Sequence, residues 1–214
     1  MIIKKMLALA AIAGMGLAPL AAQAGLAPLS AADGWPPAGS SGLEPVLFNA
    51  VSANGVKVAV GAHAYKNSAS LANDGVRNFY AQNGVYLPDG KHYANWSFDF
   101  VYDVSACQGC KVFLGIDTDS GAGVNFTDID LLAQGAPTVY AESWNLEMGF
   151  LTSGLGYDFN PYMPSSTDFR LYVTDASGAR LAATDITVNV PEPASLALVG
   201  IALAGLAAGR RRRV

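Results

Sequence analysis

The chain has 214 residues, which is enough for one domain of ordinary size or at most two small ones. Once residues 1–24 and 194–214 are set aside, seventeen acidic residues remain against seven basic ones, a net charge of −10. Neutralising the phosphates of a nucleic acid requires clustered Lys and Arg, so this composition excludes nucleic acid as a partner.

Residues 1–24 have the three-part organisation of a secretory signal peptide. Two lysines precede an apolar run over residues 6–20, and small side chains follow at Ala22 and Ala24. We predict that signal peptidase cleaves after Ala24 once the chain is exported across the inner membrane. The alternative is a retained membrane anchor, but the apolar run is short and the cleavage site follows it directly.

Residues 25–43 are rich in Ala, Pro, Ser and Gly without sustained periodicity, which indicates an extended leader or a linker. Between residues 44 and 189, short stretches rich in Val, Tyr, Phe and Thr alternate with clusters of Gly, Asn, Asp and Pro, and no stretch has a helical period over about twelve residues. The predicted strands cover residues 46–51, 56–65, 77–86, 94–104, 111–116, 128–132, 143–151, 168–175 and 184–190.

The predicted fold is all-β, an antiparallel β-sandwich of jelly-roll or immunoglobulin-like type, flanked by an N-terminal signal helix and a C-terminal transmembrane helix. Alternation is clearest in Trp96, Phe98, Phe100 and Tyr102, which share one face of a strand. We expect this aromatic face to form the core, because an open sheet of this length must bury one face against another sheet.

Cys107 and Cys110 are the only two cysteines of the chain, and they lie between two predicted strands. In an exported protein this pair predicts a disulfide, whose short loop would pin a turn. A redox-active pair is an alternative, although such pairs normally precede a helix in an α/β fold. A zinc site is a further alternative, which would need His63 and His92 as the remaining ligands.

An acidic loop follows the cysteines. Its oxygen-bearing residues are Asp117, Asp119, Asn125, Asp128 and Asp130. Hard oxygen ligands on a glycine-containing loop suit calcium, and the Asp-x-Asp-x-Gly opening resembles the start of an EF-hand-type loop. The third acid and the closing Glu of that loop are absent, so solvated turn aspartates are the alternative to a calcium site. No other cofactor is predicted.

The chain has no recognisable catalytic set, since the common hydrolase and metalloprotease motifs are absent. Glu142 and Glu147 could form a carboxylate pair for glycoside hydrolysis, but any acidic β-protein offers such pairs. Trp35, Trp96 and Trp144 could stack on sugar rings, although packing in a core is the commoner fate of such residues.

The C-terminal segment, residues 190–214, combines three features. Pro191, Glu192 and Pro193 come first, the apolar residues 194–209 follow, and four arginines close the segment at Arg210, Arg211, Arg212 and Arg213. The apolar stretch would form a helix of about 24 Å, a little shorter than the roughly 30 Å hydrocarbon core of a bilayer. The arginines would stay on the cytoplasmic side, which leaves the body across the membrane.

This order of motif, apolar helix and arginine cluster resembles the PEP-CTERM sorting signal. The resemblance implies that an exosortase, a membrane-embedded cysteine transpeptidase, cuts near Pro-Glu-Pro. It also implies a Gram-negative bacterium that makes exopolysaccharide, with the protein first anchored in the membrane through its C-terminal helix and then placed at the cell surface or in the matrix. A plain tail anchor is the alternative. Residues 114–119, 140–151, 157–161 and 168–172 resemble the C-terminal half of many uncharacterised PEP-CTERM proteins.

Three functions remain open at this point. The first is a non-enzymatic surface or biofilm-matrix protein with a structural or adhesive role. The second is a carbohydrate-binding module, supported by calcium, that holds exopolysaccharide. The third is a secreted glycoside hydrolase.

Overall fold

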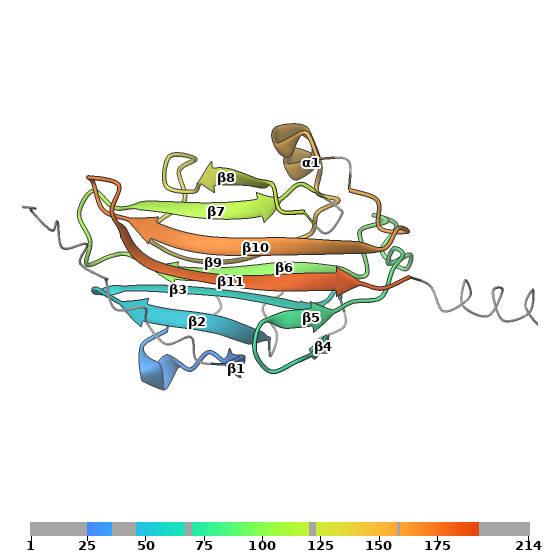
Figure 1. The fold of residues 1–214 in the computed structure, drawn as a ribbon, viewed down its shortest axis with the longest axis horizontal. Coiled ribbons are helices and arrows are strands. Elements are labelled where there is room, and N and C mark those ends of the chain that lie inside the picture. The colour runs from blue at the N-terminus through green and yellow to red at the C-terminus, as the bar shows by residue number, and fades with distance from the viewer. Residues whose placement is uncertain (1–24, 36–45, 67–69, 120–122, 158, 193–214) are drawn as a thin grey trace, which may run out of the picture.

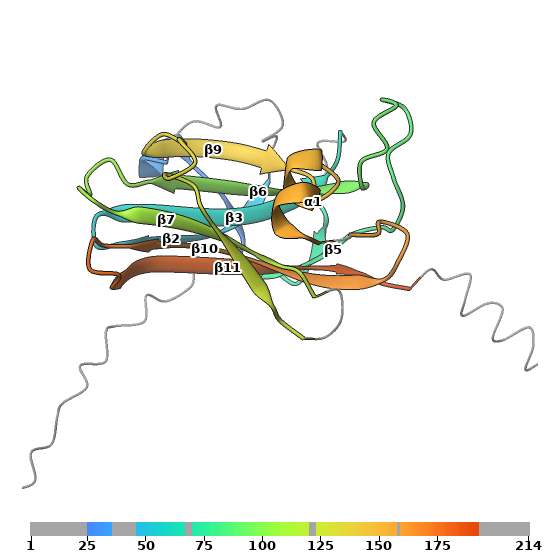
Figure 2. The ribbon, with the colours of Figure 1, turned by 90° about the horizontal axis from the view of Figure 1, so that it is seen from above.

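The computed structural model of the chain describes residues 25–35, 46–66, 70–119, 123–157 and 159–192. The signal peptide with its cleavage site, the apolar tail, Pro193 and the four terminal arginines lie outside the described residues. Within them the protein consists of two β-sheets that lie face to face, with one short helix (Figures 1 and 2).

The first sheet has five strands in the order β1-β2-β3-β6-β9, and every neighbouring pair is antiparallel. Its strands are β1 (Ala27–Pro28), β2 (Leu47–Ala53), β3 (Val56–Ala64), β6 (Trp96–Asp103) and β9 (Val139–Trp144). β9 therefore forms one edge of this sheet.

The second sheet has six strands in the order β4-β5-β11-β10-β7-β8. Its strands are β4 (Ala72–Asn73), β5 (Asn78–Tyr80), β7 (Lys111–Asp117), β8 (Phe126–Asp130), β10 (Ser165–Thr174) and β11 (Arg180–Val190). β11 pairs in parallel with β5, and the other pairs are antiparallel. β8 is an edge strand of this sheet. It lies on the same side of the body as β9, the edge strand of the first sheet.

The core between the sheets is built on the aromatic face of β6, as the alternation predicts. Trp96, Phe98, Phe100 and Tyr102 are all buried, and the ring of Phe98 stacks on that of Phe169 from β10 at a centroid distance of 4.3 Å. Burying each such side chain contributes roughly 1.5–3 kcal/mol, so this strand is a main source of the stability of the body.

The opposite face of β6 is also buried, which the alternation does not reveal. A second apolar cluster covers the outer face of the five-stranded sheet; it contains Val46, Phe48, Ala59, Val101 and Ala141, with Leu29 and Trp35 packed against it. The described part of the predicted leader therefore packs on the body, and its β1 adds a strand beside β2.

The predicted strand over residues 143–151 is wrong. β9 ends at Trp144, and residues 149–155 form the helix α1 (Gly149–Leu155). The buried side chain of Asn145 ends the strand: its amide donates to the carbonyl oxygens of Ala94 and Trp96, and its Oδ1 accepts from the backbone of Glu147.

The predicted strand over residues 77–86 is shorter in the structure, where β5 covers only Asn78–Tyr80. The all-β class is confirmed for the body, whereas the jelly-roll or immunoglobulin-like type stays a prediction. Within the part of the chain that the structure describes, no helix is both long and apolar enough to cross a membrane.

We predict that Asn145→Ala lowers the free energy of unfolding by roughly 3 kcal/mol, because it leaves several buried backbone groups without partners. Urea denaturation followed by tryptophan fluorescence measures the change. Asn83→Ala is the matched control, since the side chain of Asn83 makes no hydrogen bond among the described residues. Equal stabilities of the two variants would contradict the prediction.

Candidate functional site

A groove of about 690 Å³ opens where the two sheets end side by side. Its lining residues belong to β8 and the turn after it, to β9 and to α1. These three elements are labelled in Figure 1. The lining includes Asp128, Asp130, Gln134, Tyr140, Trp144 and Phe150. This volume lies within the range of about 300–1,000 Å³ that is typical of sites for small ligands.

The aromatic part of the groove is held in place by the core. The ring of Trp144 lies edge-on to that of Phe100, with a centroid distance of 4.8 Å, and to that of Phe98. Phe150 from α1 approaches Trp144 from another side at 5.1 Å and is 55% exposed. Trp144 is thus fixed by buried neighbours while it still lines an accessible surface.

Some of the polar residues that line the groove already form hydrogen bonds within the protein. The carboxylate of Asp128 is directed away from the groove, toward Arg170 and Tyr172 on the outer face of the six-stranded sheet. Asp130 caps the turn that follows β8 by accepting from the backbone of Ala133. Thr127, Asp130 and Gln134 are the other polar residues that line this wall and can meet a ligand.

The other wall carries a tyrosine and a carboxylate in contact. The hydroxyl group of Tyr140 donates to Glu142 over 2.9 Å. Burial and this hydrogen bond raise the pKa of Tyr140, so the phenol stays protonated and donates at neutral pH. Burial also raises the pKa of Tyr102, with a smaller effect from the charge of Asp130, so the tyrosines next to this groove stay neutral.

The helix that closes the groove is intrinsically weak. α1 has seven residues, two of which are the glycines Gly149 and Gly154, and no side chain caps its N-terminus. It ends at Gly156, which has a left-handed conformation. Its main anchor is the buried Leu151, so tertiary packing rather than helix propensity holds it against the groove.

The acidic loop lies at one end of the β7–β8 hairpin. Asp117 is 1% exposed, and its Oδ1 accepts from the backbone nitrogen atoms of Asp119 and Asn125. Asp128 and Asp130 lie further along β8, where they bind Arg170 and cap a turn, respectively. Among the described residues, no three Asp, Glu, His or Cys side chains are grouped so as to hold a metal ion. The Oδ2 atom of Asp117 is nevertheless buried and has no hydrogen-bond partner in the part of the chain that the structure describes.

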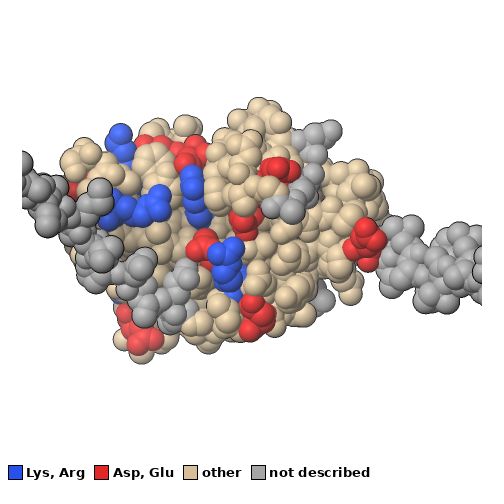
Figure 3. All heavy atoms as spheres, in the orientation of Figure 1, with Lys and Arg blue, Asp and Glu red and all other residues tan. Residues whose placement is uncertain are grey.

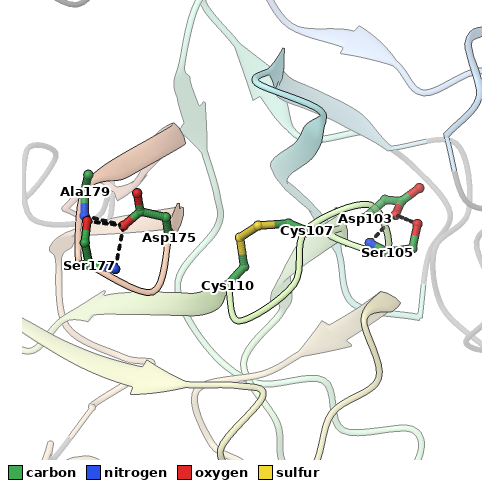
Figure 4. The surroundings of a disulfide bond; sticks show 7 residues. All are labelled: Asp103, Ser105, Cys107, Cys110, Asp175, Ser177 and Ala179. Carbon is green, nitrogen blue, oxygen red and sulfur yellow. Dashed lines mark hydrogen bonds between the residues drawn. A yellow bond between two sulfur atoms is a disulfide. The ribbon is translucent and has the colours of Figure 1, made fainter.

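Cys107 and Cys110 form a disulfide in the turn between β6 and β7 (Figure 4). The turn needs the positive φ of Gly109, and a hydrogen bond from the backbone of Cys107 to Val104 closes it. Asp103 caps the start of this turn through Ser105. The bridge therefore lies in a connection between the two sheets and does not precede a helix, unlike redox-active pairs.

A buried pair of His63 and Asp99 was not predicted from the sequence. Their Nδ1 and Oδ2 atoms are 2.7 Å apart on the outer side of the five-stranded sheet. Burial raises the pKa of Asp99, while the contact with His63 opposes this effect. No pattern in the sequence joins the two residues, because the pairing of β3 with β6 brings them together.

The outer face of the six-stranded sheet carries charges of both signs (Figure 3). Arg77 pairs with Asp168 and Asp185, and Arg170 pairs with Asp128. These arginines line a shallow depression of about 350 Å³ together with Arg180, whose guanidinium lies over a tyrosine ring. Since most of these charges are neutralised in pairs, the face has no concentrated charge to attract an ionic ligand.

The C-terminal signal begins directly at the end of the fold. β11 lies between β5 and β10 and ends at the buried Val190, after which Pro191 and Glu192 are exposed. A family model described as the PEP-CTERM protein-sorting motif matches residues 189–213. The chain carries a PEP-CTERM sorting signal. It is thereby an exported protein that an exosortase sorts, with a membrane-anchored stage before it reaches the surface.

The family model covers the C-terminal signal of this PEP-CTERM protein and not the body before residue 189. No curated protein and no solved structure matches the chain. The function of the body therefore has to be argued from its own geometry.

The structure limits where the exosortase can cut. We predict that the mature C-terminus lies at Pro191 or beyond, because cleavage before Val190 would remove residues from an interior strand. Mass spectrometry of the protein recovered from cells that contain the exosortase measures the terminus. Glu192→Ala should block processing and leave the melting temperature unchanged, since Glu192 is exposed. A mature terminus within residues 180–189, or an intact Val214, would contradict the prediction.

Proposed function

We propose that this PEP-CTERM protein is a non-enzymatic component of the cell surface or of the biofilm matrix, and that it adheres by binding a saccharide in the groove between β8, β9 and α1. The observation that carries the proposal is the position of Trp144. This residue is rigid, because buried rings hold it, and it lines an open groove of suitable size.

The chemistry of the groove suits a sugar. Saccharides present C–H faces that pack on aromatic rings and hydroxyl groups that hydrogen-bond with polar side chains at the rim. Trp144 and Phe150 offer the rings, while Asp130 and Gln134 offer the polar groups. The body is strongly acidic, so it would repel a polyanion. We therefore propose a neutral saccharide, or a neutral segment of the exopolysaccharide, as the ligand.

The absence of enzymatic activity is part of the proposal. The Glu142 carboxylate accepts from both the Tyr140 hydroxyl and the backbone of Ser143, so both of its oxygen atoms are engaged by neighbours within β9. Glycoside hydrolysis would require a second carboxyl group facing it at a defined distance across a bound sugar. Glu147, the second carboxylate that the sequence offers for such a pair, also interacts with other residues of the protein.

We predict that Trp144→Ala weakens binding to purified exopolysaccharide by at least about tenfold, which corresponds to roughly 1.4 kcal/mol. Affinity electrophoresis of the body through gels containing the polysaccharide measures the effect. Trp144→Phe should retain part of the affinity, because it keeps an aromatic ring in the groove.

Trp35→Ala is the control, because Trp35 lies on the outer face of the five-stranded sheet, away from the groove. Melting temperatures of all three variants show whether the fold is intact. Unchanged mobility of the wild-type body would refute saccharide binding. Release of reducing ends from the polysaccharide, abolished in Glu142→Gln, would instead show a hydrolase.

Calcium is a second candidate ligand, and the buried Oδ2 of Asp117 is the observation that favours it. A carboxylate oxygen without a hydrogen-bond partner costs free energy unless a water molecule or a cation meets it. A calcium ion bound there would stabilise the β7–β8 turn and, through β8, one wall of the groove.

We predict that calcium chloride raises the melting temperature of the wild-type body and not that of Asp117→Asn. The asparagine keeps the Oδ1 acceptor of the turn and removes the charge. Differential scanning calorimetry with and without the ion measures the shift, and magnesium chloride controls for ionic strength. The absence of a shift in the wild type would remove calcium from the proposal.

A further inference from the structure

The tail leaves the body through a very short connection. Val190 is the last residue of β11, and it is 3% exposed in the core. The apolar stretch of the tail begins at Ala194. Four residues of fully extended chain span at most about 14 Å, so the end of β11 must lie within that distance of the first apolar residue of the tail.

This distance places the body at the membrane surface while the tail is inserted. The headgroup region of each leaflet is roughly 5–8 Å thick. The helix predicted from the sequence for residues 194–209 would be about 24 Å long, which is shorter than the hydrocarbon core of roughly 30 Å. An inserted tail of this length would draw the connection toward the bilayer and not away from it. The end of the body where β11 terminates thus has to contact the interfacial region or lie directly above it.

The same end of the body exposes large apolar side chains. Tyr80 is the register partner of Asn189 in β11, and Tyr162 and Met163 shortly precede Ser165, the partner of Val190. Leu87 lies in the neighbouring loop, which is joined to the loop of Tyr162 by a hydrogen bond from Gly84 to Pro161. The exposed fractions are 47% for Tyr80, 64% for Leu87, 59% for Tyr162 and 56% for Met163.

We call these four residues the exit surface. They lie on β5 and on the loops next to the end of β11, which is at the right-hand end of Figure 1. The loops around it also carry Lys66 and Lys91, whose ammonium groups lie over the rings of Tyr65 and Tyr93. Tyrosine rings and lysine stems with a charged tip are typical of membrane interfaces, where one end of the side chain is apolar and the other is hydrated.

The opposite end of the body differs. There the β6–β7 turn contains the disulfide, and Val139, which pairs with Asp103, is 39% exposed. The C-terminal tail follows β11, which ends at the other end of the body. We therefore do not expect an exposed apolar residue at this end to contact lipid. Val139 therefore serves as an internal control.

We propose that, while the tail spans the membrane, the body docks on the lipid surface opposite the cytoplasm through the exit surface of Tyr80, Leu87, Tyr162 and Met163. This inference goes beyond saccharide binding and depends on the membrane-anchored stage. Docking would present Pro191 and Glu192 at the depth of the headgroups, where a membrane-embedded exosortase reaches them.

The test uses the full chain, with its tail, reconstituted in vesicles of phosphatidylethanolamine and phosphatidylglycerol. An environment-sensitive fluorophore is attached at Met163→Cys, at Val139→Cys or, within the tail, at Leu203→Cys; the two native cysteines are held in their disulfide. Lipids with a quencher in the headgroup region should quench the label at position 163 several-fold more strongly than the label at position 139. A label at Leu87→Cys should lose this quenching in the double variant Tyr162→Ser, Met163→Ser, whose melting temperature should stay unchanged.

The outcomes separate this inference from the others. Equal, weak quenching at positions 163 and 139 with a quenched tail label would overturn docking and leave anchoring and saccharide binding intact. The tail label is read with lipids that carry the quencher on their acyl chains, because position 203 would lie near the middle of the hydrocarbon core. An unquenched tail label in these lipids would overturn docking together with the membrane-anchored stage. Quenching at position 163 only when exosortase is present in the vesicles would show that the exit surface binds the enzyme and not the lipid, which also overturns the inference.

Discussion

Burial of β6 on both faces is the constraint on which the rest of the body depends. Its aromatic face packs against β10, and its other face lies beneath the cluster formed by the leader and β2. Within its sheet β6 is flanked by β3 and β9, so its backbone is paired on both edges while both of its faces are buried. The buried contact of His63 with Asp99 belongs to this arrangement, because a carboxylate can be enclosed there only with a polar partner.

The groove is a consequence of the same arrangement. β9 pairs with β6 and ends at Trp144, so Tyr140 and Trp144 keep their contacts with the aromatic core while no further strand covers them. β8 ends the other sheet on the same side. The two edge strands, β8 and β9, therefore leave a groove between the sheets, and α1 fills it only in part. An edge also has to be protected from pairing with other chains, and α1 together with a bound ligand would provide this protection.

The tail and the fold share the strand β11. Because β11 is an interior strand that runs directly into Pro191, the sorting signal has no long linker of its own. The prolines cannot continue the ladder of hydrogen bonds, so the sheet ends where the processing site begins. The groove lies along the side of the body, whereas the tail leaves from one end. A body that docks through its exit surface would therefore keep the groove open to the solvent.

The sequence by itself determined the features that depend on neighbouring residues. The alternation from Trp96 to Tyr102 predicted an aromatic core strand, and the order of Pro-Glu-Pro, apolar stretch and arginines predicted the sorting signal that the family model confirms. These patterns are local, because a strand alternates with a period of two and a targeting segment is recognised as an unfolded chain.

Only the tertiary structure decided which residues from distant segments meet. It placed Trp144 between the core and a groove, directed Asp128 to Arg170 away from the other acidic residues, and paired His63 with Asp99. It also converted part of a predicted strand into α1, because the buried amide of Asn145 takes the hydrogen bonds that would extend β9. Such outcomes depend on strand register and sheet edges, which are set by packing between segments far apart in the chain and leave no local pattern in the sequence.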